Sequence, residues 1–151
     1  MMLLKAVPYD QRTDYIDLLL LADDSEDAVR SYIDYGDLYV IHIENQIVGV
    51  MLLIPLSEDT VELKNIALSG NQRGKGIGKE AIEAAVKLYK DNGFCTMNVG
   101  TANSSIENLA FYQKAGFRMY TIIKDYFADY DPPVYEHGIR ALDLVMFERE
   151  L

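Results

Sequence analysis

The chain has 151 residues, of which half are hydrophobic and a quarter charged, and its formal net charge is −10. This length and composition are those of one globular domain with a sizeable core, and they exclude disordered, collagen-like and coiled-coil proteins. The acidic balance makes nucleic acid a poor partner, and no apolar run is long enough to cross a membrane. Cys95 is the single cysteine, which excludes an intrachain disulfide. Because the N-terminus also lacks a signal-peptide pattern, we expect a cytoplasmic protein.

The first seventy residues predict two short helices among several strands. The expected elements are, in order, a strand over 3–7, a helix over 11–21, a helix from Ser25, a hairpin of strands over 37–42 and 47–56, and a strand over 60–68. Strict alternation along the strand over 60–68 places four side chains on one face: Glu62, Lys64, Ile66 and Leu68.

The second part of the chain predicts further strands and the longest helix. The expected elements are a polar loop over 69–75, a helix over 77–91, a strand over 94–100 that buries Cys95, a helix that ends at Ala115, a strand over 117–124, a loop over 125–138, and a strand over 139–147. Ser104 and Glu107 fit a capping box at the start of the shorter helix. Since hairpins come early, the sequence predicts an α/β fold with a sheet of mixed direction and helices on its faces.

The loop between the strand over 60–68 and the longest helix is the most informative stretch. Residues 1–70 contain thirteen acidic and four basic residues, and positive charge then appears abruptly at Arg73, Lys75 and Lys79. Three glycines alternate over 74–78, where the backbone can approach a ligand closely. Free N–H groups at the start of a helix bind anions, so the loop predicts a phosphate cradle. Its spacing fits neither a P-loop nor a dinucleotide fingerprint.

Two segments together resemble a known family. The first, Arg73-Gly74-Lys75-Gly76-Ile77-Gly78, is similar to the R/Q-x-x-G-x-G/A pyrophosphate loop of the GCN5-related N-acetyltransferase (GNAT) family. The second, residues 108–117, is similar to that family's helix ending in F-Y-x-K-x-G-F. The resemblance covers essentially the whole chain and implies a single N-acetyltransferase domain over residues 1–151. It also implies a GNAT fold, with a mixed central sheet of about seven strands flanked by about four helices.

The resemblance further implies a reaction and its ligands. Acetyl-coenzyme A would be the donor, and a primary amine of a small molecule or a protein would attack it directly in a ternary complex. The residues expected to bind the coenzyme are Ile66, Ala67, Leu68, Arg73, Gly74, Lys75, Gly76, Ile77, Gly78, Asn103, Asn108 and Tyr112. His42 and His137 are too sparse for a metal site, so no metal is expected.

Two side chains are candidates for the proton transfers. An amine must lose a proton before it attacks, and Glu62 matches a glutamate that several family members carry. A glutamate on the solvent side of a strand is an equal alternative. Tyr112 matches the tyrosine that protonates the leaving thiolate in the family, although a tyrosine on an amphipathic helix is more often a core residue.

Other functions and partners stay open at this point. The main alternative is a non-catalytic coenzyme A-binding regulatory module, and another is an interaction protein that keeps only the fold. The aromatic and acidic residues over 125–138 fit a cationic acceptor, a packed excursion over the sheet, or a dimer contact. A homodimer is therefore left open as well, whereas nucleic acid and membrane are not expected partners.

Overall fold

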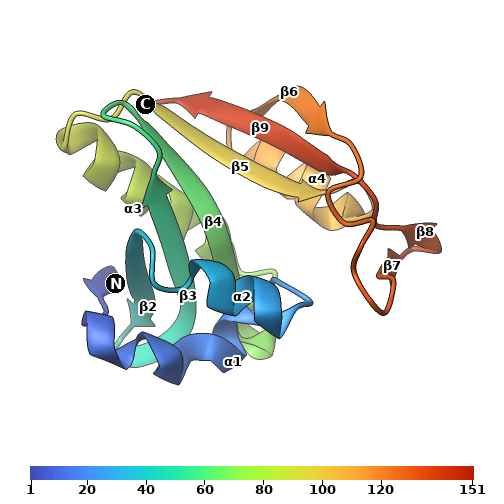
Figure 1. The fold of residues 1–151 in the computed structure, drawn as a ribbon. Helices are drawn as coiled ribbons and strands as arrows, with labels where there is room; N and C mark the ends of the chain where they lie inside the picture. The colour runs from blue at the N-terminus through green and yellow to red at the C-terminus, as the bar shows by residue number, and fades with distance from the viewer.

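The computed structural model describes residues 1–151 and has a seven-stranded mixed sheet with helices on both faces (Figure 1). The α-helices are α1 (Ile16–Leu19), α2 (Glu26–Tyr32), α3 (Ile77–Asp91) and α4 (Ile106–Lys114), and two 3-10 helices cover Tyr9–Tyr15 and Gly70–Gln72. The strands are β1 (Met2–Ala6), β2 (Asp37–Ile43), β3 (Gln46–Pro55), β4 (Thr60–Leu68), β5 (Thr96–Ala102), β6 (Arg118–Ile123), β7 (Tyr135–Glu136), β8 (Ile139–Arg140) and β9 (Leu144–Glu150). The predicted α/β class and mixed sheet are confirmed.

The sheet consists of two halves that meet at β4 and β5. Its strand order is β1-β2-β3-β4-β5-β9-β6, and β4 with β5 is the one parallel pair. These two strands pair only from Thr60 to Leu63 and from Thr96 to Val99. Beyond that point they diverge, as Figure 1 shows. The sheet therefore opens in its middle, between the ends of β4 and β5.

A bulge in β4 changes the faces on which its side chains lie. Leu53 pairs with Leu63 and Leu52 pairs with Asn65, so Lys64 is an extra residue without a partner on β3. Such an insertion interrupts alternation along the strand. Ile66 and Leu68 pack on the core beneath α3, whereas Asn65 bonds to α1 and α2 on the other face. The expectation that Glu62, Lys64, Ile66 and Leu68 share one face is therefore wrong.

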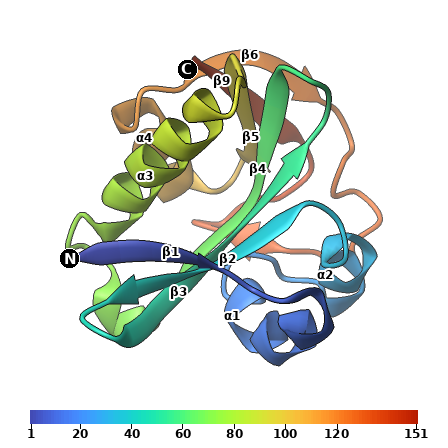
Figure 2. The same cartoon turned by 90° about the vertical axis from the view of Figure 1, so that its left-hand side faces the viewer.

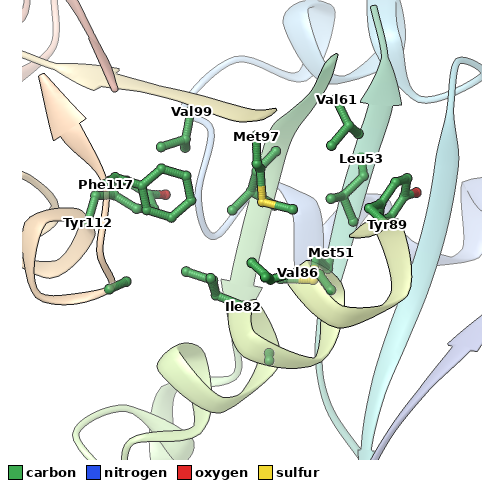
Figure 3. Packing of buried hydrophobic residues seen from close by; sticks show 14 of the residues in the cluster. Met51, Leu53, Val61, Ile82, Val86, Tyr89, Met97, Val99, Tyr112 and Phe117 are labelled. Carbon is green, nitrogen blue, oxygen red and sulfur yellow. The ribbon is translucent and has the colours of Figure 1, made fainter. Parts of the chain in front are cut away.

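Each face of the sheet has its own core. The larger core lies beneath α3 and α4 and includes Met97, Tyr112 and Phe117 (Figure 3). The smaller core lies beneath α1 and α2 and includes Leu19 and Val29. Figure 2 shows these helix pairs on opposite sides of the sheet. The smaller core includes no residue of β5, β9 or β6, so no helix covers that face of the second half.

Several predicted boundaries hold and several do not. The ranges predicted for β4 and α3 are confirmed. The helix predicted over 11–21 is divided into a 3-10 helix that ends at Tyr15 and the short α1, which ends at Leu19. Cys95 lies before β5 and is exposed, so its predicted burial is wrong. The capping box is also absent. Instead, the Ser105 hydroxyl donates to Glu136 at 2.7 Å, and the Glu107 carboxylate lies 2.9 Å from His137.

A buried arginine holds the N-terminal helices together. Arg12, which is 7% exposed, donates to the backbone carbonyls of Ile33, Tyr35 and Gly36 at 2.6–3.0 Å. Arg12→Met is expected to lower the free energy of unfolding by about 2–3 kcal/mol, because it removes the donors of partly buried carbonyls. Arg30→Met, which breaks an exposed ion pair with Glu26, is expected to cost less than about 0.5 kcal/mol. Urea unfolding measures both, and equal losses would contradict this role for Arg12.

Candidate active site

The glycine loop leaves a continuous run of backbone donors free. Every backbone N–H group from Arg73 to Lys79 lacks an acceptor within the chain, and the first bond of the following helix runs from Glu80 to the carbonyl of Gly76. Gly74 and Gly76 adopt φ values of 79° and 76°, in the left-handed region that favours glycine. Because these N–H groups lie at the positive end of α3, they form a ready anion site.

The space over this loop is open where a ligand would need it. A Cβ atom added at Gly74 or Gly76 would meet no atom within 4 Å. At Gly78 an added Cβ would lie 3.0 Å from the ring of Phe111 and 3.7 Å from Leu68. Gly78 therefore lets α3 pack closely against α4 and β4, while Gly74 and Gly76 leave the backbone accessible. Arg73 and Lys75 are exposed beside it and add positive charge.

Tyr112 lies on α4 and is 6% exposed within the larger core. Figure 3 shows its ring beside Phe117 and near Val99 on β5, and the rings of Tyr112 and Phe117 are 5.9 Å apart. Burial raises the pKa of its hydroxyl, which therefore stays protonated through neutral and mildly alkaline pH. The hydroxyl makes no hydrogen bond within the chain, and burial alone accounts for the shift in its pKa. Tyr112 is thus a core residue whose hydroxyl is still available to a ligand.

The opening between β4 and β5 leaves backbone groups unpaired along both strands. After Leu63, β4 pairs only with β3, so the β5-facing edge of residues 64–68 is free. This edge includes Ile66, Ala67 and Leu68, which are among the residues expected to bind the coenzyme. An extended ligand can pair with such an edge as an added strand would.

Asn103 and Asn108 have partners within the chain. The Asn103 side chain accepts from the N–H groups of Leu142 and Asp143 and donates to the carbonyl of Arg140, which holds the turn before β9. Asn108 is exposed at the start of α4 and donates to the Thr101 hydroxyl at 3.3 Å. Contact of either residue with the coenzyme stays a prediction.

Glu62 lies on the face of the sheet opposite Tyr112. Its neighbours Val61 and Leu63 are in the core beneath α3 and α4, so alternation directs Glu62 to the other side. It pairs in register with Asn98 of β5, just before the two strands diverge. The Glu62 carboxylate makes no ion pair within the chain. The pKa of Tyr120 is raised mainly by burial, and the negative charges of Glu148 and Glu62 add to this shift. Glu62 therefore stands at the closed end of the opening, on the face without α4.

Lys64 reaches across the opening on the same face as Glu62. Its ammonium donates to the Tyr126 hydroxyl at 3.4 Å and lies 5.2 Å from the ring centroid of Tyr32. Tyr32 belongs to α2, whereas Tyr126 follows β6 in the other half of the sheet. Sequence reasoning missed this arrangement, because the bulge that redirects Lys64 depends on pairing with β3.

An acidic cavity of about 660 Å³ lies between the same two parts of the chain that supply Tyr32 and Tyr126. It is bounded by the start of α2 and by the segment after β6, and its carboxylates are Asp24, Glu26, Asp27, Asp129 and Asp131. No lysine or arginine lines it. Burial and the neighbouring Glu136 and Asp23 raise the pKa of Asp24. Burial, Asp23, Tyr126 and Asp24 together raise the pKa of Tyr130 to about 12. The Phe127 ring lies between the rings of Tyr130 and Tyr126, at centroid distances of 5.1 and 4.8 Å.

The sheet therefore separates two kinds of surface. One face offers free backbone donors and a buried phenol, and the other offers carboxylates, phenols and one lysine. Between these two faces, the backbones of β4 and β5 diverge after Leu63 and Val99. Free backbone donors at a helix start, beside an unpaired strand edge, define a candidate binding protein for an extended anionic ligand. No helix is long and apolar enough to span a membrane, and no three side chains are grouped to hold a metal ion.

Comparison with known proteins identifies the family. The model of the acetyltransferase (GNAT) family matches residues 7–117, and the chain belongs to this family. It is 40% identical over 136 residues to the uncharacterized N-acetyltransferase YvbK of Bacillus subtilis, covering 89% of this chain and 88% of that protein. The resemblance to the GNAT family is thereby confirmed.

Two solved structures show how closely the fold is shared. An IAA acetyltransferase from Bacillus cereus is 37% identical, with a TM-score of 0.90 over 100% of both chains. A GNAT family acetyltransferase from Elizabethkingia anophelis with acetyl-CoA bound is 34% identical, with a TM-score of 0.87 over 99% of this chain and 98% of that chain. The seven-stranded GNAT fold is therefore confirmed.

Proposed function

We propose that the protein is an acetyl-coenzyme A-dependent N-acetyltransferase whose acceptor is a cationic primary amine. The observation that carries the proposal is the run of free N–H groups from Arg73 to Lys79, placed beside a buried tyrosine and an open strand edge. Membership of the GNAT family and the acetyl-CoA bound to the Elizabethkingia relative support the same donor. The proposed domain covers residues 1–151, and the proposed location is the cytoplasm.

The donor side follows from the free backbone groups. The N–H groups of residues 73–79 hold the diphosphate of the coenzyme, and Arg73 and Lys75 add charge. The free edge of β4 at Ile66–Leu68 orients the pantetheine arm, and one of its N–H groups donates to the thioester carbonyl. The Tyr112 hydroxyl, which burial keeps protonated, donates a proton to the departing thiolate.

The acceptor side follows from the charges on the other face. Glu62 takes a proton from the amine, directly or through one water, so that a neutral nitrogen attacks. The carboxylates of the acidic cavity attract a second positive charge on the acceptor. A small polycation or a basic protein segment therefore fits this side better than a neutral amine. The chain's formal charge of −10 acts in the same direction.

A melting experiment tests the donor. Acetyl-coenzyme A at about 100 times its Kd is expected to raise the free energy of unfolding by about 2.7 kcal/mol. Absence of a shift would contradict donor binding. A shift without thiol release from any amine would favour the non-catalytic regulatory module instead.

A panel of amines that are matched in chain length but differ in charge tests the acceptor on the same preparation. 1,5-Diaminopentane, 1-aminopentane and 5-aminopentanoate share a chain length but differ in their second group. Thiol release is expected to show the highest kcat/KM for the diamine and the lowest for the amino acid, because the cavity carries only negative charge. The reverse order would contradict a cationic acceptor.

A further inference from the structure

We propose that Lys64 is a self-acetylation site, at which the protein transfers an acetyl group to its own side chain. The inference rests on the proposed acetyltransferase function. A lysine ε-amine is itself a primary amine, so it belongs to the chemical class of the acceptor. What distinguishes Lys64 from the other lysines is its position at the opening in the sheet.

The backbone places Lys64 at the start of the strand edge that is proposed to hold the thioester. It is the bulged residue of β4 and directly follows Leu63, the last residue that pairs with β5. Two residues of strand separate it from Ile66, a distance of about 7 Å. The edge that would orient the thioester therefore begins at Lys64 itself.

The side chain lies over the acceptor side of the opening. Its ammonium contacts Tyr126 at 3.4 Å and the ring of Tyr32, which belong to opposite halves of the molecule. It forms no ion pair with any carboxylate of this acidic face. A phenol oxygen and an aromatic ring hold an ammonium more weakly than a carboxylate ion pair would, so little has to be broken before the nitrogen turns toward the opening.

The chemical step is the same as for a free amine. Lys64 loses a proton to the Glu62 carboxylate or to water, and its neutral Nζ attacks the carbonyl carbon of acetyl-coenzyme A. A C–N bond forms and the C–S bond breaks, and the electron pair leaves on sulfur. The nitrogen, which carries a positive charge after the attack, loses its second proton to water. The thiolate takes the proton of the Tyr112 hydroxyl, which regains one from solvent. The products are acetyl-lysine, coenzyme A and one released proton.

Peptide mapping by mass spectrometry tests the proposal. The full-length protein is incubated with acetyl-coenzyme A alone, and acetylation of each lysine is followed over time. Lys64 is expected to be acetylated at least about ten-fold faster than Lys87, because the proposal places the Lys64 nitrogen beside the thioester. Lys87 is exposed on α3 and paired with Asp91. The rate constant is expected not to depend on protein concentration, since the reaction is intramolecular.

Variants separate this reaction from chemical acetylation in solution. Lys64→Arg is expected to remove the fast phase, and Lys124→Arg, at an exposed lysine after β6, is expected to retain it. Tyr112→Phe is expected to slow acetylation of Lys64 while leaving that of Lys87 unchanged. Equal rates at Lys64 and Lys87, or a Lys64 rate that Tyr112→Phe does not alter, would overturn the proposal.

The amine panel distinguishes failure of self-acetylation at Lys64 from failure of the proposed acetyltransferase function. If amines in the panel release thiol and Lys64 stays unmodified, the self-acetylation proposal fails and the acetyltransferase function stands. If acetyl-coenzyme A fails to bind at all, the proposed function fails, and the self-acetylation proposal fails with it. Slower acetylation of Lys64 in the presence of 1,5-diaminopentane would support a shared position for the two nitrogens.

Discussion

Replacing Gly76 by valine is expected to abolish the binding of acetyl-coenzyme A, whereas the same replacement at Gly93 leaves binding intact. Gly76 precedes α3 with a φ of 76°, amid the free N–H groups of residues 73–79. A valine there forces the backbone away from the left-handed region and places its side chain where the diphosphate would lie. The expected loss in affinity is at least about 100-fold, or about 2.7 kcal/mol.

Gly93 is a matched control because it follows the other end of the same helix. Its φ is 91°, and an added Cβ there also meets no atom within 4 Å. Both variants are therefore expected to lose similar stability from backbone strain, about 1–2 kcal/mol each. Calorimetric titration measures the Kd, and thermal unfolding measures the stability. Unchanged affinity in Gly76→Val, or equal losses of affinity in both variants, would show that the loop does not hold the diphosphate.

Replacing Tyr112 by phenylalanine is expected to lower kcat by about 100-fold while the Kd for acetyl-coenzyme A changes by less than about two-fold. The hydroxyl has no partner within the chain, so its removal leaves no unsatisfied group in the core. Because burial raises the pKa of Tyr112, the wild-type hydroxyl donates across neutral pH and loses its proton only above its ordinary value. The fall in kcat is therefore expected to be constant from pH 6 to pH 9.

Tyr89→Phe serves as the control for a lost phenol in the same core. Tyr89 is 4% exposed, and its hydroxyl donates to Asp37 at 2.6 Å. In Figure 3 it lies at the opposite end of the larger core from Tyr112. This variant is expected to lose stability with little change in kcat, the opposite pattern to Tyr112→Phe. Steady-state kinetics with the best amine of the panel measures both variants. An unchanged kcat in Tyr112→Phe would remove this residue from the proposed proton transfer.

Local signals in the sequence predicted the conformation of the glycine loop and the two ends of α3. The glycines at 74, 76 and 78 mark a loop that needs positive φ at two positions and close packing at the third, and Asn92-Gly93 marks the end of α3. Each of these features depends on residues a few positions apart. The predicted ranges of β4 and α3 were confirmed for the same reason.

Contacts between distant segments account for what the sequence did not predict. The face on which Lys64 lies depends on pairing with β3, and its position over the opening depends on Tyr126, sixty-two residues away. Ser104 and Glu107, expected to cap the start of α4, instead contact Glu136 and His137. A capping motif is a local preference, and partners brought by the chain's return after β6 displaced it.

The position of the opening between β4 and β5 also bears on how the acceptor specificity of the protein can evolve. Residues that line the donor side belong to β4, α3 and α4, while the segment after β6 supplies much of the acceptor side. That segment is largely loop, so substitutions in it cost little folding energy. On the proposed function, exchange of the segment between β6 and β9 would therefore change the choice of acceptor and leave the proposed coenzyme site on β4, α3 and α4 intact.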